Sequence, residues 1–181
     1  MTANLIPSLE SCVVQSYSFF VAGKPETQGS KNAFGRAYKD KEGQTRVAVS
    51  MVEQSKGLPA WRASVGRIAT LMRPPGWSTS GAYMLSSVFY MPRPKFHFDK
   101  HGNLKKNAPI LHCKRKDSDK LLRAINDALT GICYDDDAFV VTGSYLKIYC
   151  DPSIGPGVSL EILRLDQAAA AKEIAALLQD S

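Results

Sequence analysis

The chain has 181 residues, with 44% hydrophobic and 22% charged residues, a formal net charge of +6 and a pI of about 9.2. This is enough for one domain with its own core, and no apolar run reaches the roughly 20 residues that a membrane-spanning helix needs. No glycine-rich phosphate loop is present, which argues against a nucleotide-driven motor. The four cysteines fit neither a zinc site nor a disulfide framework, and residues 1–15 do not resemble a signal peptide, so we expect a cytoplasmic protein with reduced thiols.

The first half of the chain predicts short strands and one helix. Residues 16–22 read as a strand. Residues 26–46 are polar and basic, and predict either a mobile loop with a short hairpin that closes on DNA or a plain surface loop. Residues 47–51 return as a short strand. Apolar spacing then predicts a helix over 58–72, in which Trp61 belongs to the buried face rather than to a platform for stacked bases.

A third strand precedes a polar loop that holds every histidine of the chain. The strand covers residues 82–91 and is ended by a Pro-Arg-Pro run, because proline cannot donate to the strand ladder. The histidine spacing in loop 95–113 fits no zinc pattern. We expect His97 and His101 to be solvated or to touch phosphate, and we regard His112 as a candidate auxiliary acid or base.

Two acidic groups mark the stretch 114–137. Asp117 and Asp119 open a helical pattern that ends near Gly131, a residue suited to a left-handed cap. A second acidic run then stands directly before a valine-rich strand; it consists of Asp135, Asp136 and Asp137. One short helix and a turn separate the two groups, so this layout can bring their carboxylates to one point.

Gathered carboxylates indicate a divalent cation. Two carboxylates about 4 Å apart repel by about 4 kcal/mol at an effective dielectric near 20, and a bound cation removes that cost. Mg²⁺ typically takes one or two carboxylates plus a substrate phosphate, so the pattern indicates metal-assisted phosphodiester hydrolysis. The structural alternative is that Asp117 and Ser118 cap the helix, that Asp119 favours its dipole, and that 135–137 is a solvated turn.

The positive charge is concentrated around the first acidic pair. Residues 93–123 hold ten basic and three acidic residues, a local balance of +7. Such a block indicates a polyanionic partner, nucleic acid first, and its alternative is a solvated basic face.

The end of the chain predicts further strands and a helix. Residues 138–149 form one or two strands, with Gly143 at a bulge or turn. Lys147 lies ten residues after Asp137, about 33 Å along a straight strand, so it reaches the acidic site only if the chain bends or a second subunit offers it. A last strand over 158–163 and an alanine- and leucine-rich helix over 165–179 follow.

Taken together, these elements predict a two-layer α+β fold, with a mixed, mostly antiparallel sheet and helices packed on one face. We expect residues 1–181 to form one domain. The C-terminal helix within residues 164–181 would cap the sheet or pack against a second subunit.

The combined motifs resemble the RusA family of Holliday-junction resolvases. The stretch from Asp117 to Asp137 reads D-x-D-K-L-x-R-A-x-x-D-A-L-T-G-x-x-Y-x-D-D and is followed by a strand with Lys147. Upstream, the chain carries similar short signatures: Gly23-Lys24-Pro25, Gln28-Gly29-Ser30-Lys31, Trp61-Arg62 and Met91-Pro92-Arg93-Pro94. The resemblance covers roughly residues 17 to 163.

The resemblance implies a homodimeric, metal-dependent endonuclease that resolves four-way DNA junctions in recombination and repair, in a bacterial or phage-infected cell, with no membrane partner. It implies Mg²⁺, or Mn²⁺ in its place, held by Asp117, Asp119 and Asp137 with Asp136 as helper. Lys120 and Arg123 would neutralise charge on the phosphate. The residues it implies in DNA binding are Lys31, Arg93, Lys95, Lys114, Arg115, Lys116 and Lys147.

Three positions depart from the family pattern. Lys120 stands where the family usually has Asn, Arg123 replaces the helix lysine, and Phe139 replaces a Gln. Arg123 can hold a phosphate but cannot give up a proton at neutral pH, whereas Lys120 can supply an ammonium. Two other readings stay open at this point: a non-catalytic basic DNA-binding module, and a metal nuclease for flaps, forks or RNA.

Overall fold

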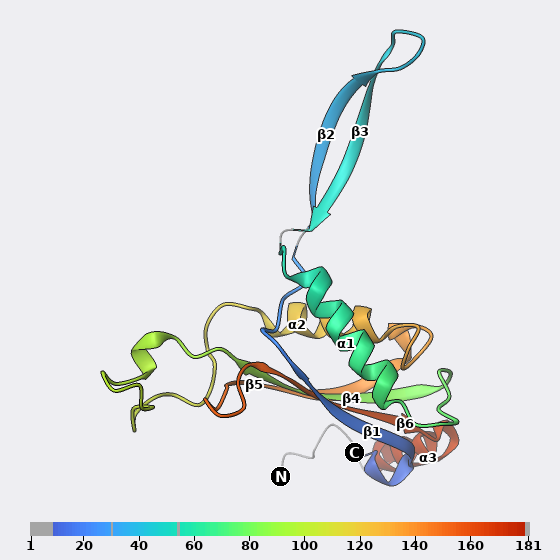
Figure 1. The fold of residues 1–181 in the computed structure, drawn as a ribbon. Coiled ribbons are helices and arrows are strands. Elements are labelled where there is room, and N and C mark those ends of the chain that lie inside the picture. Colours follow the sequence, from blue (N-terminus) through green and yellow to red (C-terminus); the bar gives the residue numbers. More distant parts are fainter. Residues whose placement is uncertain (1–8, 30, 54, 180–181) are drawn as a thin grey trace.

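The computed structural model describes residues 9–29, 31–53 and 55–179 as two layers from which a two-stranded ribbon projects (Figure 1). The helices and strands are β1 (Val13–Ala22), β2 (Lys31–Lys39), β3 (Thr45–Glu53), α1 (Leu58–Met72), β4 (Ala82–Met91), α2 (Ser118–Leu129), β5 (Val140–Tyr149), β6 (Gly157–Leu165) and α3 (Gln167–Gln179). Short 3-10 turns are η1 (Glu10–Cys12), η2 (Lys95–His97) and η3 (Asp137–Phe139). Helices α1 and α2 lie on one face of the main sheet, so the predicted two-layer α+β fold is confirmed.

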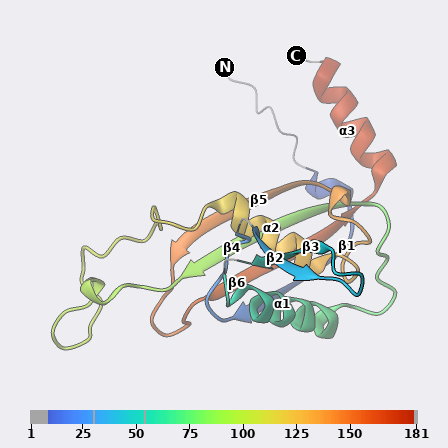
Figure 2. The same cartoon turned by 90° about the horizontal axis from the view of Figure 1, so that it is seen from above.

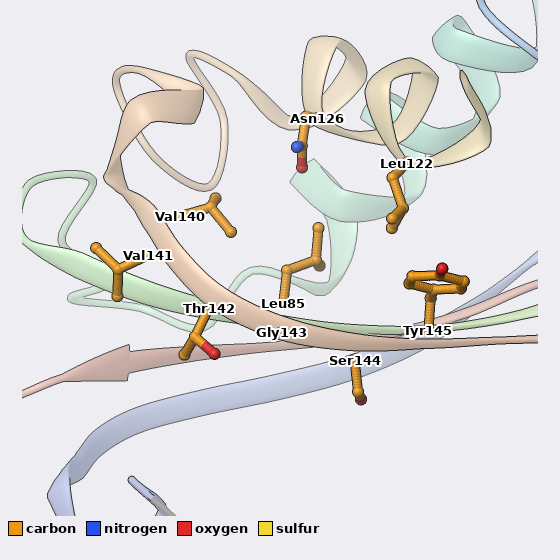
Figure 3. Close-up of a pocket in the computed structure, with 9 residues that line it drawn as sticks. All are labelled: Leu85, Leu122, Asn126, Val140, Val141, Thr142, Gly143, Ser144 and Tyr145. Atoms are coloured by element: carbon orange, nitrogen blue, oxygen red, sulfur yellow. The ribbon is translucent and has the colours of Figure 1, made fainter. Parts of the chain in front are cut away.

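The main sheet is mixed, and its one parallel pair decides where α2 lies. Strand β6 runs antiparallel to both β1 and β4, whereas β5 pairs in parallel with β4 at the edge of the sheet. A parallel pair needs a crossover connection, and α2 lies within the crossover from β4 to β5. The helix therefore packs over the sheet beside β5. Figure 3 shows its residue Leu122 above Tyr145 of that strand.

The core lies between the sheet and these two helices. Strand β4 buries alternate residues, among them Leu85 and Phe89, as expected for a strand with one covered face. The two helices meet closely at Gly66 of α1, where a Cβ atom would lie 3.3 Å from the carbonyl oxygen of Ala128. Trp61 is 5% exposed, so its predicted place in the core is confirmed. The predicted bounds of α1 and β4 also match the structure.

The prediction for residues 26–46 was wrong in its extent. Instead of a loop with a short hairpin and a separate strand over 47–51, strands β2 and β3 pair over nine residues each. From Gly35 to Ala48 nearly every side chain is exposed, so the sequence lacks the alternation that marks a half-buried strand. Ser30, part of the Gln-Gly-Ser-Lys signature, lies outside the described residues.

Helix α3 extends beyond the sheet (Figure 2). Its Ala170 packs into a small cluster with Leu9, Cys12 and Leu165, which joins it to the start of the chain and to the end of β6. Most of its other side chains are exposed. Within the described ranges, no helix is long and apolar enough to cross a membrane.

Candidate functional site

The first acidic pair stands at the start of α2 with its carboxylates uncommitted to capping. Asp117 occupies the N-cap position, yet its side chain makes no capping hydrogen bond. Its carboxylate is 64% exposed and pairs instead with Lys120, one turn into the helix, at 3.0 Å. Asp119 is exposed in the first turn. The capping alternative therefore does not account for Asp117, and both carboxylates face solvent at a helix end whose dipole attracts anions.

The second acidic run is used differently. The Asp136 carboxylate accepts a hydrogen bond of 2.8 Å from the backbone N–H of Ala138, which caps η3. The backbone N–H of Asp135 donates to the carbonyl oxygen of Thr79 at 2.9 Å. Asp137 is exposed at the first position of η3. For Asp136 the capping reading holds, and Asp137 keeps an accessible carboxylate.

The two groups lie toward different ends of α2. Burial raises the pKa of Tyr134, and the charges of Asp137 and Asp127 add to this effect. The Tyr134 hydroxyl donates to Asn126 Oδ1 at 3.1 Å, and α2 contacts η3, which begins at Asp137, so Asp137 lies toward the second half of the helix. Asp119 precedes Asn126 by seven residues, about 10 Å along the axis. In the part of the chain that the structure describes, no three His, Cys, Asp or Glu side chains are close enough together to hold a metal ion.

An open groove separates α2 from β5. Leu122 and Asn126 form its helix side, and residues 140–145 form its strand side, with the ring of Tyr145 below Leu122 (Figure 3). Gly143 is required here because a Cβ atom would lie 2.0 Å from the carbonyl oxygen of Leu85. The predicted bulge lies just before Gly143, where the pairing register of β4 and β5 shifts between Tyr83 and Met84.

Lys147 lies at the first acidic pair rather than the second. Its Nζ donates to the carbonyl oxygens of Lys116 at 2.8 Å and Lys114 at 3.3 Å. It reaches them without a bend in the chain or a second subunit, because α2 lies over β5 with its first turn toward the end of that strand.

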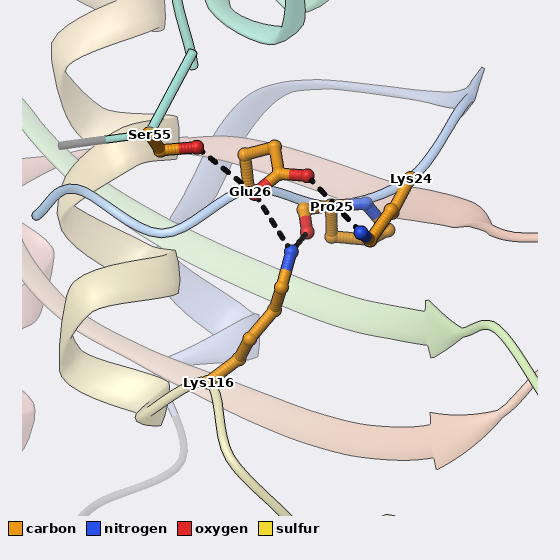
Figure 4. Close-up of polar contacts among 5 residues, drawn as sticks. All are labelled: Lys24, Pro25, Glu26, Ser55 and Lys116. Carbon is orange, nitrogen blue, oxygen red and sulfur yellow. Dashed lines mark hydrogen bonds and ion pairs between the residues drawn. The ribbon is translucent and has the colours of Figure 1, made fainter. Parts of the chain in front are cut away.

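A polar contact network fixes the residue before Asp117. Lys116 is the only non-glycine residue with a positive φ, 86°, among the described residues. Its Nζ donates to Glu26 Oε2 at 2.9 Å and to the carbonyl oxygen of Pro25 (Figure 4). The Ser55 hydroxyl donates to the same carboxylate at 3.1 Å. A left-handed residue of this kind costs about 1–3 kcal/mol and persists only where its surroundings hold it, and here both ends of Lys116 are held.

Glu26 is the functional candidate that sequence reasoning missed. Burial by itself would raise the pKa of this carboxyl, but the Lys116 ammonium and the Ser55 hydroxyl outweigh it, so the pKa is lowered from its ordinary value of 4.5. The available signal was an acidic residue inside an otherwise basic segment. Its partner, 90 positions away, could not be read from local pattern.

The remaining basic residues fall into two groups. Lys95, Lys114, Arg115 and Arg123 are exposed. Arg93, by contrast, donates from Nε to the carbonyl oxygen of Cys150 at 2.8 Å and from Nη1 to that of Pro109 at 2.9 Å. Arg93 therefore holds the loop after β4 against the body. Lys31 begins β2, but its side chain lies outside the described part.

The expectation for His97 was wrong. The ring is 3% exposed and packs edge-on against Tyr149, and burial together with the Arg93 and Lys105 charges lowers its pKa. Burial and the charges of Lys147 and Lys116 also lower the pKa of His112. Within the described ranges, the buried Nδ1 of His112 makes no hydrogen bond. Its role as an acid or base stays a prediction.

Comparison with known families identifies the family of this chain. The family model for the endodeoxyribonuclease RusA matches residues 31–162, from the start of β2 into β6, and so includes both acidic groups. No curated protein matches the chain. The matched segment is well over half of the sequence, and it contains the exposed carboxylates and the basic approach to α2. The chain therefore belongs to the RusA family of endodeoxyribonucleases, which resolve Holliday junctions.

Proposed function

We propose that this chain is a Mg²⁺-dependent, structure-specific endonuclease that resolves four-way DNA junctions by paired phosphodiester cleavage during recombination and repair. The observation that carries the proposal is the start of α2. There, two exposed carboxylates, Asp117 and Asp119, stand beside the exposed cations Lys114 and Arg115. A polyanionic backbone can bind at this place only if something offsets the two carboxylates, and a divalent cation does so.

The oxygen chemistry of these side chains suits a hard cation at the start of α2, although Asp137 would have to approach Asp117 and Asp119 to share it. Asp117, Asp119 and Asp137 offer exposed carboxylate oxygens, the ligands that Mg²⁺ prefers, and Mn²⁺ is an alternative. The ion would supply Lewis-acid stabilisation of the phosphate and activation of water. Asp136 would act as an outer helper, since its carboxylate already holds η3. Without the ion, the ammonium of Lys120 partly balances the charge of Asp117.

Arg123 and Lys120 would neutralise charge that develops on the phosphate. Arg123 lies four residues after Asp119, so both project from one face of α2 and can meet the same phosphate. Because the guanidinium stays protonated at neutral pH, Arg123 serves as a binding group and not as a proton donor. Lys120 is the group near the pair that can titrate, and its ion pair with Asp117 keeps it there.

DNA binding would follow the exposed cations around this helix start. Lys95, Lys114 and Arg115 would contact backbone phosphates without reading sequence. Lys116 and Lys147 support the same surface from below, because their ammonium groups hold the segment that presents those cations. Arg93 contributes by fixing the neighbouring loop.

A homodimer fits both the substrate and the surface. A junction has two-fold symmetry and needs two cuts, so two sites related by the same axis can cut opposite strands. The edge strand β5 leaves Val141 60%, Tyr145 55% and Leu146 46% exposed. The end of this edge pairs with loop residues Ile110 and His112, and exposed apolar side chains beside the rest of the edge are typical of a surface that another copy covers.

The test is a cleavage assay with Mg²⁺ on a four-way junction, a linear duplex, a fork and a matched RNA. We expect cleavage of the junction above the other substrates, and a loss of about 100-fold or more for Asp119→Asn. Equal cleavage of all substrates would favour a less selective nuclease. No metal-dependent cleavage of any substrate, together with tight junction binding, would leave only the non-catalytic DNA-binding module.

A further inference from the structure

The β2–β3 ribbon (Lys31–Glu53) stands apart from the two-layer body (Figure 1). Each strand has nine residues, which gives an arm of about 30 Å. A two-stranded hairpin is at best marginally stable by itself in water. A ribbon of this length, exposed on both faces from Gly35 to Ala48, therefore suits a surface that binds a partner.

The strand register gives the ribbon two unlike faces. Tyr38 lies opposite Arg46, and Arg36 lies opposite Ala48, so these side chains share one side. Ala37 lies opposite Val47 on the other side, next to Gly35 and, nearer the tip, to Lys39, so that side carries one cation and no exposed aromatic ring in its described part. We call the side with Arg36, Tyr38 and Arg46 the cationic face. Two guanidinium groups flanking an exposed aromatic ring form a surface suited to phosphates and bases.

The tip of the ribbon is pre-organised. The Asp40 carboxylate accepts hydrogen bonds from the backbone N–H groups of Glu42 at 3.0 Å and Gln44 at 2.9 Å, and from Arg46 Nε at 2.6 Å. Gly43 supplies the left-handed turn residue, with φ 80°. The Arg46 side chain is still 59% exposed. Its orientation is thus set before any partner binds.

The base of the ribbon lies next to the proposed active site. Glu26 precedes β2 and Ser55 follows β3, and both are joined to Lys116, the residue before Asp117 (Figure 4). The backbone N–H of Gln28 also donates to the carbonyl oxygen of Lys120 at 3.0 Å. A molecule lying along the ribbon is consequently guided toward the start of α2.

On these grounds, and resting on the proposed junction cleavage, we infer that the cationic face of the ribbon lies in the major groove of a duplex arm of the junction. The major groove is about 12 Å wide and admits a two-stranded ribbon. The ribbon carries five basic and three acidic residues, so its net charge suits DNA. At 3.4 Å per base pair, an arm of about 30 Å follows about nine base pairs outward from the crossover.

The experiment measures DNA binding with the full chain carrying Asp119→Asn, so that bound junction is not cut. The test variant adds Arg36→Ala and Tyr38→Ala, and the matched control adds Val47→Thr on the opposite face. We expect the test variant to weaken the Kd for a four-way junction about 10-fold and to lower the salt dependence by about one counterion, with the control unchanged. Dimethyl sulfate footprinting should show protection of guanine N7 atoms, which lie in the major groove, within about nine base pairs of one arm, and this protection should be lost in the test variant only.

Three results would overturn the inference. One is an unchanged Kd and footprint in the test variant. A second is equal loss in the Val47→Thr control. The third is a molecular mass of the test variant in solution, without DNA, that differs from the mass of the chain carrying Asp119→Asn alone. That result would assign the ribbon to contact with a second copy of the chain. None of these results touches the cleavage proposal, which fails only if the chain with Asp119 intact does not cut junctions.

Discussion

The two acidic groups of this chain have similar composition and different structure. At the start of α2, Asp117 occupies a capping position without capping, and a lysine balances its charge. In the second group, Asp136 caps η3 and the Asp135 backbone is bound to Thr79. The carboxylates of the first group therefore stay accessible. In the second group, the Asp136 carboxylate hydrogen-bonds within its own turn. An aspartate at a helix start is informative when its oxygens do not cap the backbone of that helix.

The largest expected effect is on the cleavage rate, and it distinguishes the two acidic groups. Asp119→Asn should lower junction cleavage about 100-fold or more, because it removes a charged oxygen from the proposed ion site without changing side-chain size. Asp135→Asn is the matched control and should change the rate less than about two-fold, since the structural contact there comes from its backbone N–H. Single-turnover rates at saturating enzyme make the comparison. Equal losses in both variants would contradict the assigned difference.

The next comparison lies within the second group. Asp137→Asn should lower the cleavage rate about 10- to 100-fold while leaving thermal stability unchanged. Asp136→Ala should act mainly on stability, by about 1 kcal/mol, because it removes the cap of η3. Cleavage rate and denaturant unfolding measured on both variants decide this. The division of roles fails if Asp136→Ala lowers the rate more than Asp137→Asn does.

A smaller effect concerns the strained residue before Asp117. Lys116→Ala and Lys116→Gly both lose the contact with Glu26, and each should lower cleavage about 10-fold if that contact positions the acidic pair. The glycine variant should be more stable than the alanine variant by about 1 kcal/mol, since only glycine adopts φ 86° without strain. Urea unfolding provides the test. Equal stability would mean that the left-handed backbone is not retained.

The smallest effect is a pH dependence of stability. The pKa of Glu26 is lowered in the folded chain, so its contact with Lys116 stabilises the fold above the ordinary value of 4.5 and this stabilisation is lost as pH falls through the lowered pKa. Glu26→Gln should therefore reduce the melting temperature near neutral pH and have little effect at the acidic end. A deficit of the same size at pH 7 and pH 3 would argue against the carboxylate as the stabilising group.

Sequence reasoning predicted those parts of the fold in which burial imposes a pattern. The bounds of α1 and β4 follow from apolar periodicity ended by proline and glycine, and the helix α2 follows from the same rule. The ribbon could not be predicted in full because solvent lies on both of its faces from Gly35 to Ala48. The burial of His97 depends on Tyr149, which is distant in sequence.

The candidate site was likewise predictable only in part from the sequence. Motif spacing selected Asp117, Asp119 and Asp137 as candidates, and their role stays a prediction, whereas the family match supports the nuclease assignment. The contact between Glu26 and Lys116 joins segments 90 positions apart and has no local signature. The sharing of one ion by all three aspartates stays a prediction, as does the extent of the domain over residues 1–181.

The most direct test of the central proposal is a Mn²⁺ titration followed by electron paramagnetic resonance, with the full chain bound to a junction whose scissile phosphates resist cleavage. The unsubstituted chain, Asp119→Asn and Asp137→Asn are compared. If carboxylates from both acidic groups hold the same ion, each substitution should weaken the same binding step by about 10-fold or more. A binding step that Asp119→Asn weakens and Asp137→Asn leaves unchanged would contradict a shared ion and confine the metal to the start of α2.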